Sequence, residues 1–155
     1  MQKIIAVTLG ENPKIHLKEQ IEKERSTAIF DLISSNHFEP IGDFKGPFKL
    51  HLFKTENRII FDIIDKNDTP LLTVPIGLSN FRNLIKDYFI VCESYFKFMP
   101  NTPCCQIDAI DMGRRSIHNE AAELLKQKLE GVIDIDEQTA RALFTLVCVL
   151  HLDRF

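Results

Sequence analysis

The sequence lacks the short motifs that identify the commonest catalytic sites. It contains no glycine-rich phosphate loop, no Gly-x-Gly-x-x-Gly fingerprint, no Gly-x-Ser-x-Gly elbow and no His-Glu-x-x-His zinc motif. The Glu-x-x-His pairs of ferritin-like di-iron proteins are also missing. No reaction can therefore be assigned from a motif, and whether the chain is an enzyme stays open.

Cysteine is scarce, and its spacing excludes the strongest metal and redox signatures. None of the four cysteines forms a Cys-x-x-Cys pair. Cys92 and Cys148 lie in apolar helical runs, where a free cysteine behaves as a small hydrophobic residue. Cys104 and Cys105 adjoin the start of a predicted helix, which could lower a thiol pKa, but no second group of ligands accompanies them. We expect no metal site and no cofactor.

The sequence has neither an excess of basic residues nor a long apolar run. It carries 19 Lys and Arg against 22 Asp and Glu, for a net charge of −3, which gives no electrostatic basis for binding nucleic acid. The longest strongly apolar run, Ala142–Leu152, is too short to cross a bilayer, and the start shows no signal-peptide pattern. We expect one cytoplasmic domain over residues 1–155, with no nucleic-acid or membrane partner.

Four segments have the composition or the alternation of β-strands. Residues 3–9 are rich in β-branched side chains and predict a buried strand. Residues 48–54, 58–65 and 69–76 follow one another across short turns, which predicts antiparallel neighbours in a meander. The stretch 36–47 contains two Gly and two Pro and is predicted to be a long loop.

Four further segments are predicted to be helices: residues 17–35, a segment from Ser79 that ends before Pro100, residues 102–131 and a last helix that begins near Asp136. The segment from Ser79 is apolar nearly all round at its middle, so we expect it to be central and buried. The last helix is apolar on several sides, which predicts either deep burial or the interface of a homodimer. The predicted fold is α+β, an antiparallel sheet of three to five strands packed by about four helices.

The helix predicted over residues 102–131 is the most distinctive stretch of the chain. Thr102 can cap its N-terminus, Pro103 suits its first turn and Gly131 can end it. Arg114 falls on its apolar stripe, so a charge is directed at the core, where its desolvation must be offset by partners. The stripe itself comprises Ile107, Ile110, Ile117, Ala121 and Leu124.

Polar residues gather around Arg114 on the same helix. The candidate functional cluster comprises Asp111, Arg114, Arg115, His118, Asn119 and Glu120, joined by Arg25 from the apolar stripe of the first helix. Arginines can bind an anion, and a histidine can exchange a proton. The alternative is a structural ion network between helices. In such a network, Asp111 and Arg114 would tie this helix to Arg25, Asp31, Asp87 or Glu93 on other helices.

Stretches from nearly the whole chain carry a family resemblance. They are Glu24-Arg25 with Ala28–Leu32, Glu56–Arg58, Phe81-Arg82 with Lys86–Phe89, Cys92–Tyr95, Gln106–Arg115, His118–Glu120, and Ala140-Arg141 with Leu143–Leu146 through Val149–His151. They resemble uncharacterised protein family 0262, found chiefly in alphaproteobacteria, and the run Ile110–Arg115 is specific to it. The resemblance implies a single-domain bacterial protein and carries over neither an activity nor a catalytic residue. Cys104 and Cys105 depart from the residues usual in that family.

Two classes of function follow from these patterns. The main prediction is a non-enzymatic cytosolic protein with a binding or regulatory role, for which the last helix could form a homodimer. The alternative is a small enzyme or binder that acts on an anionic metabolite through the arginine, histidine and aspartate cluster. A concave pocket lined by the cluster would favour the second class, and a filled core around Arg114 would favour the first.

Overall fold

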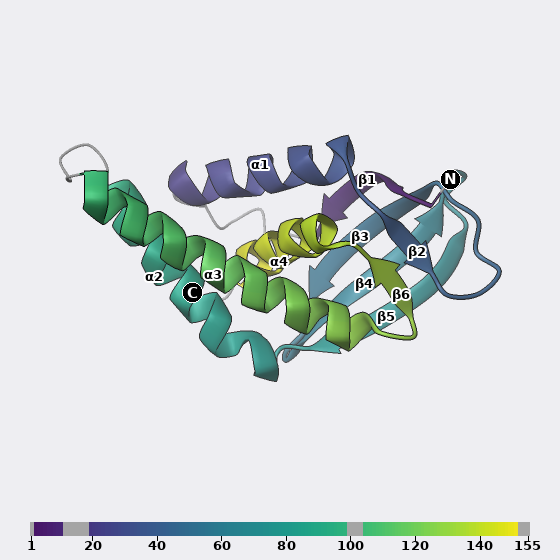
Figure 1. Ribbon diagram of the computed structural model, residues 1–155. Helices are drawn as coiled ribbons and strands as arrows, with labels where there is room; N and C mark the ends of the chain where they lie inside the picture. Colours follow the sequence, from purple (N-terminus) through teal and green to yellow (C-terminus); the bar gives the residue numbers. More distant parts are fainter. Residues whose placement is uncertain (1, 11–18, 99–103, 152–155) are drawn as a thin grey trace.

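The computed structural model describes residues 2–10, 19–98 and 104–151, without the side chains of Gln20 and of residues 93–98 and 104–110. The predicted α+β class is confirmed (Figure 1). The elements in chain order are β1 (Ile4–Leu9), α1 (Glu19–Ser34), β2 (Phe38–Pro40), β3 (Phe48–Lys54), β4 (Arg58–Asp65), β5 (Pro70–Gly77), a 3-10 turn (Ser79–Phe81), α2 (Arg82–Phe98), α3 (Cys104–Leu129), β6 (Ile133–Ile135) and α4 (Glu137–His151).

The main sheet has four strands in the order β1-β3-β4-β5. β3, β4 and β5 form the predicted antiparallel meander. β1 differs from the all-antiparallel expectation, because it pairs with β3 in parallel. A parallel neighbour needs a long crossover, which the chain provides through α1. The buried face of the meander includes Leu50 and Leu52 on β3 and Phe61 on β4.

A second, two-stranded sheet joins parts of the chain that the sequence patterns leave apart. β2 pairs antiparallel with β6, and Glu39 stands opposite Asp134. The sequence predicts a loop over residues 36–47 and no firm element over residues 132–135, so the strand β2 corrects that prediction. Three-residue strands have too short an alternation to be recognised alone, and each is stabilised by a partner distant in sequence.

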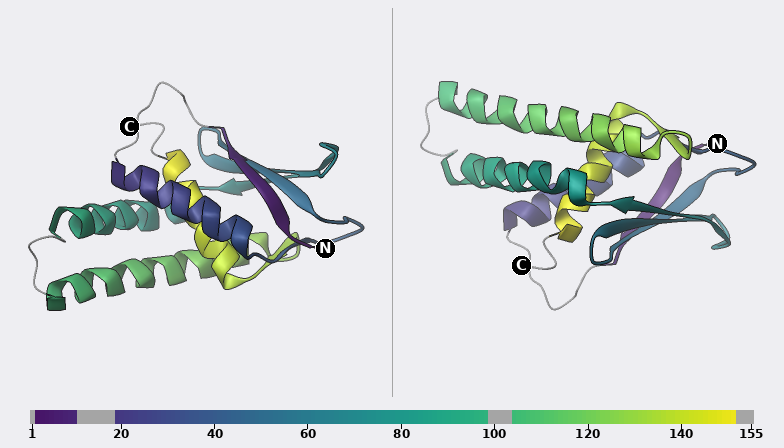
Figure 2. Two further views of the ribbon diagram at one scale, coloured as in Figure 1. Left: turned by 90° about the horizontal axis from the view of Figure 1, so that it is seen from above. Right: turned by 90° about the horizontal axis from the view of Figure 1, so that it is seen from below.

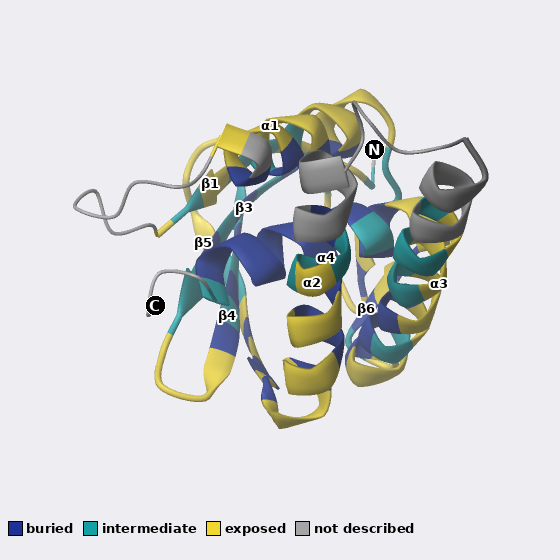
Figure 3. Ribbon diagram, turned by 90° about the vertical axis from the view of Figure 1, so that its left-hand side faces the viewer, coloured by how far each residue is buried: buried dark blue, intermediate teal, exposed yellow. Residues whose placement is uncertain are grey.

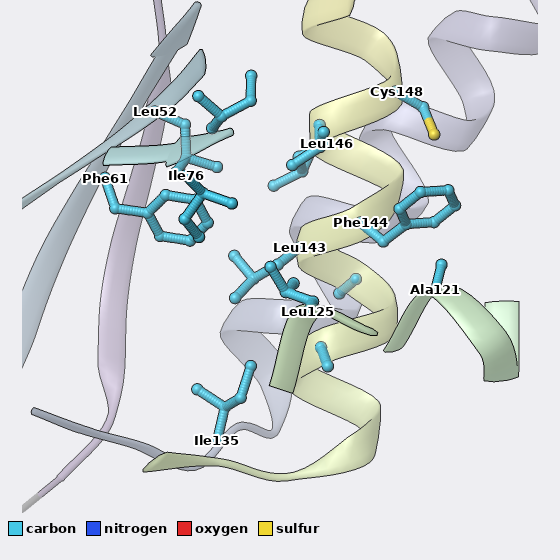
Figure 4. Close-up of a cluster of buried hydrophobic side chains, with 14 of the residues drawn as sticks. Leu52, Phe61, Ile76, Ala121, Leu125, Ile135, Leu143, Phe144, Leu146 and Cys148 are labelled. Atoms are coloured by element: carbon cyan, nitrogen blue, oxygen red, sulfur yellow. The ribbon is translucent and has the colours of Figure 1, made fainter. Parts of the chain in front are cut away.

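α4 is the central helix of the fold. It lies between the main sheet and the other helices, and its ribbon is buried along most of its length (Figures 1 and 3). Leu143 and Leu146 point toward the sheet, whereas Phe144 and Cys148 point away from it (Figure 4). Every residue over 142–150 is buried within the single chain. The apolar character of α4 therefore reflects deep burial within one chain. A homodimer stays a prediction, but residues 142–150 of α4 are not available as its interface.

α2 and α3 form an antiparallel pair that extends past the end of the sheet (Figure 2). α2 buries Tyr88 and Cys92, but Ile90 between them is 52% exposed. The prediction that this helix is central is therefore wrong, because its apolar run continues beyond the face that the bundle covers. α3 is continuous through Gly113 and ends before Gly131, whose φ of 80° is the left-handed backbone of a helix stop. Thr102 and Pro103 lie outside the described residues.

Within the described residues, no helix combines the length and the apolar character that a membrane span requires.

Candidate functional site

A cleft of about 600 Å³ opens between α1, α3 and α4. These three helices lie one beside another in Figure 1. The cleft combines three arginines, three carboxylates and one histidine with several hydroxyl groups. Its lining residues are Glu24, Thr27, Ala28, Asp31, Ser34, Ser35, Asp111, Arg114, Arg115, His118, Gln138, Arg141, Ala142 and Thr145.

The central feature of this cleft is an ion pair between α1 and α3. Glu24 is only 7% exposed and accepts a hydrogen bond from Nη2 of Arg114. Glu24 belongs to the buried face of α1, three residues after Ile21 and four before Ala28. In a helix of 3.6 residues per turn, the adjacent residue Arg25 is rotated about 100° from Glu24. Arg25 therefore does not lie on this buried face.

The surroundings of the ion pair raise the pKa of Arg114 and that of the neighbouring Cys92 thiol. Burial alone would lower the pKa of Arg114, but the charge of Glu24 raises it, and the net change is a rise. Cys92 places its Sγ 3.7 Å from Oε1 of Glu24. Burial, followed by the charge of Glu24, raises the pKa of this thiol to about 11. Cys92 therefore stays protonated at neutral pH and donates to the carboxylate.

The other two arginines of the cleft have more exposed partners. Arg141 of α4 contacts Asn119 of α3 and lies 3.2 Å from Oε1 of Glu137 on its own helix. Arg115 lies 2.9 Å from Oδ2 of Asp111 one turn away. The Arg115 side chain is 65% exposed, so this pair is held at the surface, where an ion pair contributes little to stability.

Two guanidinium groups of the cleft retain unused donors. A guanidinium carries five N–H donors. Nε of Arg114 and Nε of Arg141 are both buried and have no hydrogen-bond partner among the residues that the structure describes. A buried donor without an acceptor costs free energy, and such groups are rare in folded proteins. Neither guanidinium group therefore has its full set of hydrogen-bond acceptors among the described residues.

His118 forms the apolar wall of the cleft. Its ring packs edge-on against Tyr88 and Phe144, with ring centres 5.2 and 6.1 Å apart. Its Nε2 lies 3.2 Å from Oγ1 of Thr145, which donates its own proton to the Arg141 carbonyl at 3.2 Å. Nε2 of His118 therefore carries the proton and donates to Thr145. Burial, then the charges of Arg114 and Arg141, lowers the pKa of His118 to about 4.

We expect His118 to make the stability of the protein depend on pH below neutrality. Its folded-state pKa lies below the ordinary value of 6.5, so its contribution is fully present above pH 6.5 and is lost as the pH falls toward 4. The difference corresponds to about 3 kcal/mol at most. NMR titration of the ring protons should show the transition near pH 4.

Urea unfolding at neutral and acidic pH provides the second measurement for His118. Because other groups also titrate in this range, His118→Asn is the matched control, and it should lose less stability on acidification than the wild type. A His118 ring that titrates near 6.5 would contradict the prediction.

The structure brings four members of the predicted cluster into this cleft: Asp111, Arg114, Arg115 and His118. Asn119 does not line the cleft but accepts a hydrogen bond from Arg141, which does. Glu120 is exposed and does not line the cleft. Arg25 lies on another side of α1, 3.6 Å from Glu22, and does not join the cluster. Arg25 and Arg114 therefore do not share one cleft.

The partner of Arg114 also differs from the sequence-based alternatives. Glu24 forms this pair, whereas Asp31 lines the cleft without an ion pair in the described part of the chain. Asp87 is exposed, and the side chain of Glu93 lies outside the described residues. The sequence patterns also do not predict Glu24, Arg141 or Thr145 as site residues, although all three line the cleft and make the contacts described above. A local signal for Arg141 is its charge directly before the apolar run 142–150 of α4.

The fold and the cleft define a small α+β protein in which a buried arginine–carboxylate pair lines an arginine-rich cleft. The family resemblance is confirmed by comparison with known proteins. The chain belongs to the uncharacterised protein family UPF0262, whose family model matches residues 1–153.

Bacterial relatives are similar to this chain along almost its whole length. A UPF0262 protein of Paramagnetospirillum magneticum is 46% identical over 97% of this chain and 96% of its own length. One of Rhodospirillum rubrum is 49% identical over 96% of this chain and 91% of its own length. One of Sphingopyxis alaskensis is 44% identical over 98% and 94%. No solved structure matches the chain.

Proposed function

We propose that this protein binds a small anionic molecule in the cleft between α1, α3 and α4. The observation that carries the proposal is that Arg114 of α3 and Arg141 of α4 line one cleft, and that each guanidinium group has a donor unused by the described residues. The cleft volume of about 600 Å³ falls in the range of small-molecule sites. Oxygen atoms of a ligand would accept further hydrogen bonds from the guanidinium N–H groups of both arginines.

The charge balance of the cleft limits the kind of ligand. Arg114 and Arg115 each have a carboxylate partner in the cleft, and Arg141 pairs with Glu137 beside it. Recognition therefore depends on directed guanidinium hydrogen bonds rather than on a large excess of positive charge. A carboxylate or phosphate group is the chemistry that such a planar donor array matches.

Binding without covalent chemistry agrees with the state of the nearby reactive groups. His118 has a pKa of about 4 and uses its Nε2 proton on Thr145, so it is a poor general base near pH 7. The Cys92 thiol is buried, with its pKa at about 11, and so it is not an activated nucleophile. These properties favour a binding protein over an enzyme.

Thermal unfolding with sulfate or phosphate tests the proposal. At an anion concentration tenfold above Kd we expect stabilisation of about 1.4 kcal/mol, or a rise in Tm of roughly 3–6 °C for a chain of this size. Arg141→Met should remove most of this rise. Its side chain is 39% exposed, so the substitution itself should cost less than about 1 kcal/mol.

The matched control for the anion experiment is Arg82→Met. Arg82 is an exposed arginine that bonds to Asn57 and lies outside the cleft. Sulfate also stabilises proteins by exclusion from their surface, and that effect is the same in every variant. An equal rise in Tm for Arg141→Met and Arg82→Met would overturn the proposal.

A further inference from the structure

Three potential metal ligands meet on the outer face of the β2–β6 ribbon, away from the arginine cleft. Glu39 of β2 stands directly opposite Asp134 of β6. His37 precedes Glu39 by two residues, and side chains two apart point to the same face of an extended strand. The intervening Phe38 and the neighbouring Ile135 point the other way and are buried. The backbone pairing therefore gathers all three polar side chains on one side.

The distances among these groups suit a bound metal ion. Nε2 of His37 lies 3.0 Å from Oδ2 of Asp134 and 3.7 Å from Oε2 of Glu39. One ligand atom from each residue lies within 4.8 Å of the other two. Four ligands at about 2.0–2.1 Å from Zn²⁺ in a tetrahedron are separated by about 3.3 Å. The two distances from His37 bracket that separation.

The negative charges of Glu39 and Asp134 also favour the binding of a cation at this position. Two carboxylates directly opposite each other on antiparallel strands repel and destabilise the ribbon. A single imidazole carries at most one positive charge and so does not balance two carboxylates. A divalent ion would neutralise both carboxylates and would bind the neutral imidazole at the same time.

We propose that His37, Glu39 and Asp134 form a binding site for a divalent transition-metal ion such as Zn²⁺. One imidazole nitrogen and two carboxylate oxygens are a mixed ligand set that favours such an ion over Mg²⁺ or Ca²⁺, which prefer oxygen alone. Three protein ligands leave a coordination position open for water or an exchangeable group.

The surroundings leave room for that open position. The three side chains are between 42% and 64% exposed. A hollow of about 340 Å³ adjoins them and is lined by Glu39 and Asp134 together with Lys126 and Glu130 near the end of α3. A metal ion here would tie β2, which follows α1, to β6, which precedes α4, so its binding would also stabilise the ribbon against heat.

Isothermal titration of the metal-free protein with Zn²⁺ tests the site. We expect one ion per chain with a Kd in the micromolar range, and binding at least tenfold weaker in each of His37→Gln, Glu39→Gln and Asp134→Asn. Zn²⁺ should raise the Tm of the wild type and not that of these variants. Each substitution is at an exposed position, and circular dichroism will verify that the fold is retained.

The control variant is His51→Gln, which removes a histidine of β3 that bonds to Thr8 and lies outside the ribbon. It should bind Zn²⁺ as the wild type does. The absence of saturable binding in the wild type would overturn the proposal. So would a loss of less than tenfold in any of the three ribbon variants, or an equal loss in His51→Gln.

Discussion

Replacing Arg114 with methionine is expected to lower the free energy of unfolding by about 3–5 kcal/mol, because it leaves a buried carboxylate unpaired. Glu24 is 7% exposed, and Arg114 is its ion-pair partner. Methionine retains most of the side-chain packing and removes the charge, so the loss measures the missing partner. Urea unfolding of the wild type and Arg114→Met at pH 7 gives the difference directly.

Two further variants show whether the loss comes from the unpaired charge. Arg115→Met breaks a pair whose side chains are 65% and 40% exposed, and it should cost less than about 1 kcal/mol. In the double variant Glu24→Leu/Arg114→Met both charges are absent, and most of the stability should return. Equal stability of Arg114→Met and the wild type would show that the Arg114 head group is held by solvent instead.

Arg114→Met also bears on the proposed anion site. If Arg114 supplies one of the two donors, the variant should lose the stabilisation by sulfate that the wild type shows. Arg141→Met is the clearer of the two tests, because its own stability is expected to change little. Loss of the anion effect in Arg114→Met but not in Arg141→Met would overturn the proposal that the two arginines share one site.

Replacing Phe144 with alanine is expected to cost about 3–5 kcal/mol, the range for a large aromatic side chain removed from a packed core. Phe144 is fully buried on the central helix. Its ring lies 6.4 Å from Phe81, 5.9 Å from Tyr88 and 6.1 Å from His118, measured between ring centres. The substitution therefore leaves a cavity where α2, α3 and α4 meet.

The comparison for Phe144→Ala is Phe30→Ala on the outer face of α1. Phe30 is 70% exposed, and its replacement should change stability by no more than about 0.5 kcal/mol. Both variants are measured by urea unfolding under the same conditions. A cost for Phe144→Ala as small as that for Phe30→Ala would contradict the central position of α4.

The sequence by itself determined the features that depend on neighbours along the chain. The alternation over residues 48–76 and its short turns require an antiparallel meander, which the structure contains. Asp111, Arg114 and His118 are three and four residues apart, so any helix brings them to one side. The structure places all three in the cleft for this reason.

Only the tertiary structure decided which residues meet across elements. Helical spacing placed Arg114 on the apolar stripe of α3, but its partner Glu24 lies 90 residues away. The packing of α1 and α3 against α4 brought Glu24, and not Arg25, to Arg114. The pairing of β2 with β6 likewise joins Glu39 to Asp134, although neither three-residue strand has a recognisable pattern. Local periodicity fixes the face on which a side chain lies, whereas the contact it makes depends on how distant segments pack.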